Sequence, residues 1–153
     1  MIMDIQEYLP QLKEIFERRD VVLAYLFGSQ VQGTAGPLSD IDVAVLLLPE
    51  VPRKRWTEIQ TKLICELMSI FHRNNDVDVV ILNRAPALLA YEVAKHGKVV
   101  YQDASLPHVD FLTLAISRHA DTQPLRDIFT TYLLERASQR AALRSKALTE
   151  VAA

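Results

Sequence analysis

The order of apolar and amphipathic segments predicts an α/β protein with a helical extension at its C-terminus. Three short runs have the length and apolar composition of buried strands, at residues 21–27, 40–48 and 76–82. Helical periodicity precedes the first run, separates the second from the third, and takes over after residue 103. Strands and helices that alternate in this way are typical of a sheet covered by helices.

The helical segments are marked by their apolar spacing and by their end signals. In the segment 4–18, Pro10 predicts either a kink or the true start of the helix. The segment 86–96 has proline at its start and Gly97 just past its end, as helices often do. The remaining expectations are a short helix at 29–33, helices at 53–72, 107–118 and 124–146, and a short strand at 98–101.

The bulk composition favours a cytoplasmic globular protein. Half of the 153 residues are hydrophobic and 24% are charged, which suits a packed core. The net charge of −2 gives no strong electrostatic case for binding long nucleic acid. No apolar run reaches membrane-spanning length, and the N-terminus lacks the pattern of a secretion signal. The lone Cys65 excludes an internal disulfide, and we expect a buried core thiol.

A glycine turn and a pair of aspartates carry the chemistry of this sequence. Gly28-Ser29 follows the first apolar run, and Asp40-Ile41-Asp42 opens the second. Carboxylates at i and i+2 on a strand point to one face, about 7 Å apart. Two like charges so close are unfavourable unless a cation lies between them, and oxygen ligands favour Mg²⁺. The spacing therefore predicts a divalent metal site facing a turn that can hold phosphates.

Gly28, Ser29, Asp40 and Asp42, in this strand context, resemble the signature of the DNA polymerase β nucleotidyltransferase superfamily. The segments after the third strand, at 82–89 and 97–101, resemble its minimal nucleotidyltransferase (MNT) branch. The resemblance covers about residues 1–103. It implies a polymerase β-like core, a small mixed sheet flanked by helices, as domain 1–103. Residues 104–153 then form a C-terminal helical extension that the family core does not predict.

The resemblance also implies roles for individual residues. Asp40 and Asp42 would hold two Mg²⁺ ions, and Asp78 on the third strand would complete the catalytic and metal-binding triad. Asp76 competes for that third role, but Asp78 is favoured because an apolar strand follows it. Gly28 and Ser29 would bind the triphosphate of ATP, because glycine admits a phosphate and a helix N-terminus favours anions.

Several weaker candidates have competing interpretations. Ser39 either bonds phosphate or caps the turn. Arg84 follows the third strand and could reach the nucleotide, although nothing in the sequence requires it. Basic residues at 53–55 are more often a solvated helix face than a phosphate or RNA contact. The same alternatives hold for the arginines at 136, 140 and 144, which form either a solvated face or a contact surface for an acidic partner or RNA.

MNT proteins are often the antitoxin of a toxin–antitoxin pair whose toxin is a HEPN-domain ribonuclease. The resemblance implies that this chain moves AMP from ATP onto a tyrosine hydroxyl of such a toxin and neutralises it. One alternative is an antitoxin that covers the toxin without catalysis. Another is a nucleotidyltransferase that modifies a small molecule such as an aminoglycoside, although about fifty extra residues are few for a second domain.

Overall fold

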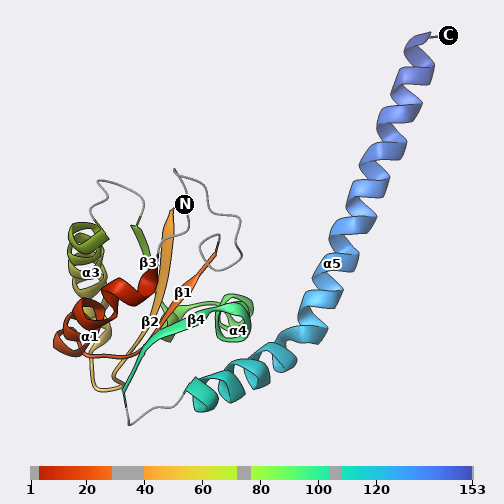
Figure 1. Cartoon of the computed structure of the whole chain (residues 1–153). Helices are drawn as coiled ribbons and strands as arrows, with labels where there is room; N and C mark the ends of the chain where they lie inside the picture. Colours follow the sequence, from red (N-terminus) through yellow and green to blue (C-terminus); the bar gives the residue numbers. More distant parts are fainter. Residues whose placement is uncertain (1–3, 29–39, 72–76, 104–107, 153) are drawn as a thin grey trace. The chain divides into compact units, whose positions relative to one another are not determined.

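The computed structural model describes residues 4–28, 40–71, 77–103 and 108–152 (Figure 1). The chain divides into two compact units, Met1–Ile116 and Ser117–Ala153. The first unit holds the sheet and its covering helices. The second consists of the greater part of one long helix.

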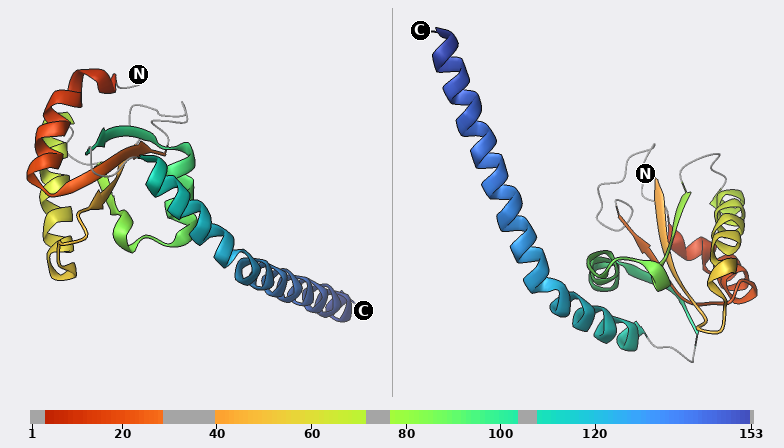
Figure 2. Two further views of the ribbon diagram at one scale, coloured as in Figure 1. Left: turned by 90° about the horizontal axis from the view of Figure 1, so that it is seen from below. Right: turned by 180° about the vertical axis from the view of Figure 1, so that it is seen from behind.

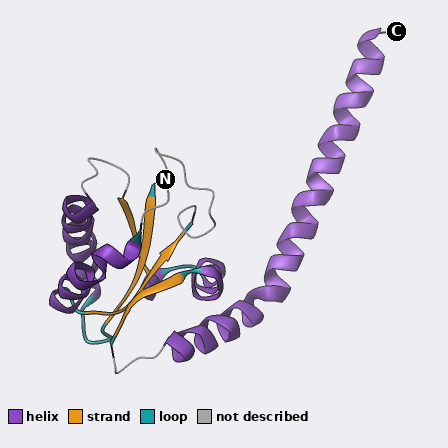
Figure 3. Ribbon diagram, in the orientation of Figure 1, coloured by secondary structure: helices purple, strands orange, loops and turns teal. Residues whose placement is uncertain are grey.

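The first unit is built on a four-stranded mixed sheet, as the sequence predicts (Figure 3). The strands are β1 (Val21–Phe27), β2 (Ile41–Leu47), β3 (Val77–Ile81) and β4 (Lys98–Gln102), in the order β3-β2-β1-β4. β1 runs antiparallel to both β2 and β4, whereas β2 and β3 are parallel. Of the two central strands, β1 is apolar throughout and β2 is apolar except for Asp42, which suits strands that are buried on both faces.

Helices cover both faces of this sheet (Figure 2). The first face packs against α1 (Leu9–Arg18) and α3 (Trp56–Phe71), and the second against α4 (Ala87–His96) and the first turns of α5 (His108–Ala152). Alternate strand residues enter alternate cores, as the pleat of a strand requires. The first core includes Phe16, Ile41, Val43, Leu63 and Val79, and the second includes Tyr25, Ala44, Val93, Phe111 and Ala115.

Short 3₁₀ turns account for most differences between the expected and observed helix ends. The first predicted helix consists of η1 (Ile5–Tyr8) followed by α1, so Pro10 lies in the first turn of α1 and marks its true start. The side chain of Asp4 begins η1 by accepting a hydrogen bond from the Gln6 N–H at 3.0 Å. Similar turns precede α3 and follow β3, as η2 (Arg53–Arg55) and η3 (Leu82–Arg84).

The prediction of two separate C-terminal helices is wrong. α5 is continuous from His108 to Ala152, with Pro124 inside it. Proline removes one backbone hydrogen bond and crowds the preceding turn, but it does not always end a helix. No glycine follows residue 97 to supply a stop, and the Thr122 hydroxyl donates to the carbonyls of Arg118 and His119 at 3.2 and 3.0 Å.

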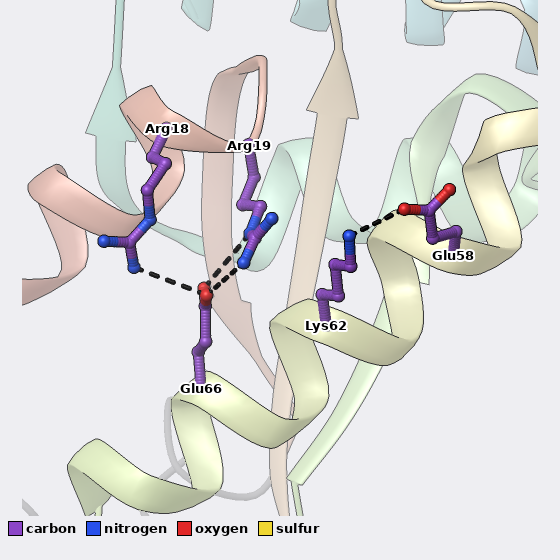
Figure 4. A network of polar contacts seen from close by, with 5 residues as sticks. All are labelled: Arg18, Arg19, Glu58, Lys62 and Glu66. Carbon is purple, nitrogen blue, oxygen red and sulfur yellow. Dashed lines mark hydrogen bonds and ion pairs between the residues drawn. The ribbon is translucent and has the colours of Figure 1, made fainter.

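The prediction of a buried Cys65 is also wrong, because its side chain is exposed. The buried stripe of α3 runs through Ile59, Leu63 and Leu67, and Cys65 is two residues, about 200°, away from it. Nearby on α3, Glu66 pairs with Arg18 and Arg19 at the end of α1, and Glu58 pairs with Lys62 (Figure 4). The contacts of Glu66 join the two helices that cover the first face, whereas the Glu58–Lys62 pair lies within α3.

Candidate functional site

The turn after β1 brings a glycine against an aspartate. Gly28 has φ of +75°, in the left-handed region that favours glycine. A Cβ atom at this position would lie 2.3 Å from Oδ2 of Asp42 and 3.3 Å from its Cγ. Any other residue would therefore displace the carboxylate as well as strain the backbone. The sequence predicted that Gly28 makes room for a phosphate; the structure shows that it makes room for Asp42, and the phosphate contact stays a prediction.

Two of the three predicted carboxylates lie on neighbouring strands at the same level. Asp42 is paired in register with Phe27 of β1 on one side and with Asp78 of β3 on the other. The flanking residues Ile41 and Val43 enter the first core, and so do Val77 and Val79 on β3. By alternation, Asp42 and Asp78 both lie on the second face, which α4 covers.

Asp40 comes immediately before β2 and is exposed, as Asp78 is, whereas Asp42 is half-buried. Burial raises the pKa of the Asp42 carboxyl, and the nearby negative charges of Asp78 and Asp40 raise it further. Both of the other carboxylates thus add to the effect of burial on the pKa of Asp42. Such crowding of negative charge is what a bound cation relieves.

The donor set fits Mg²⁺ in chemistry, because all three side chains offer carboxylate oxygens to a hard ion. The described residues contain no group of three His, Cys, Asp or Glu side chains already placed to hold a metal ion together. The triad as a metal site therefore stays a prediction. Ser29, Ser39 and the competing Asp76 lie outside the described residues, as does the predicted helix at 29–33.

A cavity that the sequence did not indicate adjoins the glycine turn. It has a volume of about 120 Å³ and lies between the end of β1 and the last turns of α4. Phe27, Gly28 and Leu89 contribute to its wall, and Glu92 and His96 are its titratable side chains. These two residues form an i,i+4 pair, 3.7 Å between His96 Nε2 and Glu92 Oε2. In the sequence, the i,i+4 spacing of these two residues just before Gly97 is the feature from which the pair could have been predicted.

The other basic candidates make contacts of their own. Arg84 Nη2 donates to Gln60 Oε1 at 2.6 Å, which holds this guanidinium beside α3, on the opposite face from Asp42. In the C-terminal unit, Arg136 donates to the Tyr132 hydroxyl at 2.7 Å. Arg140 and Arg144 follow it along one exposed helix face, and whether that face is solvated or contacts a partner stays a prediction. Among the described residues, no helix is both long enough and apolar enough to cross a membrane.

Comparison with known proteins identifies a family and a relative. Residues 10–105 match the family described as Polymerase beta, Nucleotidyltransferase. The chain is 36% identical over 109 residues to the protein adenylyltransferase MntA of Shewanella oneidensis, covering 69% of this chain and 73% of that protein.

Solved toxin–antitoxin structures share the fold. A crystal structure of a toxin–antitoxin with AMP-PNP contains a chain that is 27% identical, with a TM-score of 0.67, over 82% of this chain and 98% of the other. An MntA–toxin complex with two aspartates replaced by glutamates contains a chain that is 25% identical, with a TM-score of 0.68 and the same coverage.

Proposed function

This chain belongs to the polymerase β nucleotidyltransferase family, and we propose that it is the antitoxin of a HEPN/MNT pair. In this proposal it transfers AMP from ATP to a tyrosine hydroxyl of a HEPN-domain ribonuclease toxin, which neutralises the toxin. The observation that carries the proposal is the contact of Gly28 with Asp42, whose strand neighbour in register is Asp78. The adenylyltransferase name of the Shewanella relative and the AMP-PNP in the toxin–antitoxin structure support it.

Each carboxylate has a part in the proposed reaction. The tyrosine oxygen attacks the α-phosphorus of ATP, a new P–O bond forms, and the bond to the bridging oxygen of pyrophosphate breaks. Asp40 and Asp42 would hold Mg²⁺, and Asp78 would accept the proton of the attacking hydroxyl. Two bound Mg²⁺ ions would supply stabilisation of the charge on the attacking and leaving oxygens. The raised pKa of Asp42 favours this role, because a cation there relieves the repulsion.

The test is the intact mass of the partner toxin after incubation with this chain, ATP and Mg²⁺. We expect mass increases in units of AMP with the wild-type chain and none with the double variant Asp40→Asn/Asp42→Asn. Asp110→Asn, at an exposed aspartate of α5, controls for loss of a negative charge and should transfer normally. Transfer that persists in the double variant would exclude these aspartates as the catalytic site.

A second candidate is neutralisation by binding alone. It is favoured by the exposed face of the C-terminal unit, where Tyr132, Leu133 and Leu148 lie beside the three arginines. Exposed apolar surface next to arginine is typical of protein interfaces. The same experiment separates the candidates, because a toxin that gains no AMP and is inhibited equally by wild type and double variant is neutralised by binding.

A further inference from the structure

We propose that the cavity beside Gly28 is the nucleobase subsite and that Glu92 selects adenine by accepting a hydrogen bond from its amino group. This inference rests on the proposed nucleotidyl transfer and adds the residue that determines base preference. The cavity shares Gly28 with the turn whose missing Cβ leaves room for Asp42. Gly28 therefore lies both in the wall of the cavity and against Asp42, one of the proposed catalytic carboxylates.

The size and walls of the cavity suit one flat ring. An apolar cavity of about 150 Å³ takes a benzene molecule, and this one has a volume of about 120 Å³. Phe27, Leu89 and Val93 supply apolar wall. The cavity can thus hold the six-membered ring of a purine while the ribose and triphosphate remain outside.

The polar groups of the cavity disfavour phosphate and favour a hydrogen-bond donor. Glu92 brings a carboxylate, and α4 ends at His96 beside the cavity, where the helix dipole is negative. A triphosphate would be repelled here. The exocyclic amino group of adenine is a donor, whereas guanine presents a carbonyl oxygen at the same position. At position 6 a carboxylate therefore accepts from adenine and repels the carbonyl of guanine, whose own donors, N1–H and the 2-amino group, would have to turn toward Glu92 for guanine to bind.

The sheet order places this cavity on the nucleotide side of the site. Asp78 lies on β3, which adjoins β2 on the side away from β1. The cavity is at the end of β1 and reaches Gly97, just before β4. If Asp78 accepts the proton of the attacking hydroxyl, the acceptor lies on the β3 side of Asp42. The cavity lies on the β1 side of Asp42, where it can receive the base of the nucleotide.

The test measures the affinities of AMP-PNP and GMP-PNP, with Mg²⁺, for the full chain by titration calorimetry. We expect the wild type to prefer AMP-PNP by about tenfold or more. Glu92→Gln should bring the ratio close to one, because a glutamine amide can turn to pair with either base. Leu89→Trp, which fills the cavity, should weaken the binding of both nucleotides about tenfold or more.

Glu58→Gln is the matched control. Glu58 is 52% exposed and pairs with Lys62 at i,i+4, much as Glu92 is 53% exposed and pairs with His96. It lies on α3, which covers the other face of the sheet, so its variant should keep the wild-type ratio. Circular dichroism of each variant verifies the fold.

Several outcomes would overturn the proposal. They are a wild type without base preference, a ratio unchanged in Glu92→Gln, and a Leu89→Trp protein that binds both nucleotides normally. If Leu89→Trp instead raises only the KM for the toxin, the cavity receives the acceptor tyrosine and the nucleobase assignment is wrong. The proposed function fails separately, when a wild type that binds AMP-PNP with the expected preference adds no AMP to the toxin.

Discussion

At position 28, both the backbone conformation and the neighbouring side chain of Asp42 require glycine. The positive φ disfavours any residue with a Cβ, and a Cβ would meet Oδ2 of Asp42 at 2.3 Å. We expect Gly28→Ala to lower the free energy of unfolding by about 1–3 kcal/mol and to abolish nucleotide binding. Urea denaturation and titration with AMP-PNP would measure the two effects.

A double-mutant cycle separates strain from contact at this position. In an Asp42→Ala background the carboxylate is gone, so Gly28→Ala should cost only the backbone strain, and the two changes should not add. Equal costs in both backgrounds would mean that the contact between Gly28 and Asp42 contributes nothing to stability.

We expect Asp42 to make the stability of the metal-free protein depend on pH. Burial, Asp78 and Asp40 raise its pKa in the folded state, so the folded chain holds this proton more tightly than the unfolded chain. Stability therefore falls as pH rises from the unfolded pKa through the folded pKa of Asp42. We expect Asp42→Asn to lack this decline and to be at least as stable as wild type at neutral pH.

Urea denaturation in a chelator, repeated across the acidic range, measures the effect at Asp42. Asp110→Asn again controls for the removal of an exposed negative charge. If wild type and Asp42→Asn have parallel pH profiles, the carboxylates do not interact in the way that the pKa shift indicates.

At the scale of the element, α5 contains a proline in its interior. Pro124 supplies no N–H to the helix, and a proline in a helix interior costs about 3 kcal/mol relative to alanine. We expect Pro124→Ala to raise the helix content and the thermal stability of the C-terminal unit, as followed by far-UV circular dichroism. Ser138→Ala, at an exposed position of the same helix, should change both far less. A Pro124→Ala protein no more helical than wild type would indicate that α5 is interrupted there in solution.

The directions of the strands bring the residues of the candidate site together. β1 and β2 are antiparallel, so the C-terminal end of β1 lies beside the N-terminal end of β2. β3 is parallel to β2, so its N-terminal end lies at the same end of the sheet. Gly28, Asp42 and Asp78 thus converge from three strands. The alternation of strand residues then sets both carboxylates on the face covered by α4.

At the scale of the whole molecule, the first compact unit extends beyond the domain that the sequence predicted. The expected domain ended at residue 103, and the first compact unit extends to Ile116. The extra residues bring Phe111 and Ala115 into the second core, and His108 Nδ1 lies 2.5 Å from the buried Tyr25 hydroxyl. We propose that the start of α5 belongs structurally to the nucleotidyltransferase domain.

Two truncated chains test that proposal. Chain 1–116 should keep the stability and AMP-PNP affinity of the full protein. Chain 1–103 should lose at least about 3–5 kcal/mol of unfolding free energy, the usual cost of removing a buried phenylalanine. Equal stability of the two would place the domain boundary at residue 103 instead. Urea denaturation of both chains makes the comparison.

The sequence by itself determined the local features of this protein. Apolar runs predicted β1, β2 and β3 because most positions of a buried strand are apolar, and Gly97 indicated the end of α4. The identity of Gly28 and the spacing of Asp40 and Asp42 also predicted the family, since the spacing of a motif is a property of the chain. The family comparison and the mixed sheet confirm those predictions.

Tertiary structure decided what depends on packing between distant segments. The register that pairs Asp42 with Asp78 joins strands separated by a whole helix, and no local pattern sets it. The exposure of Cys65 depends on which stripe of α3 meets the sheet. The cavity beside Gly28 exists because β1 and α4, which are distant in the chain, end side by side. Local propensity cannot encode such contacts, which form only when the chain folds.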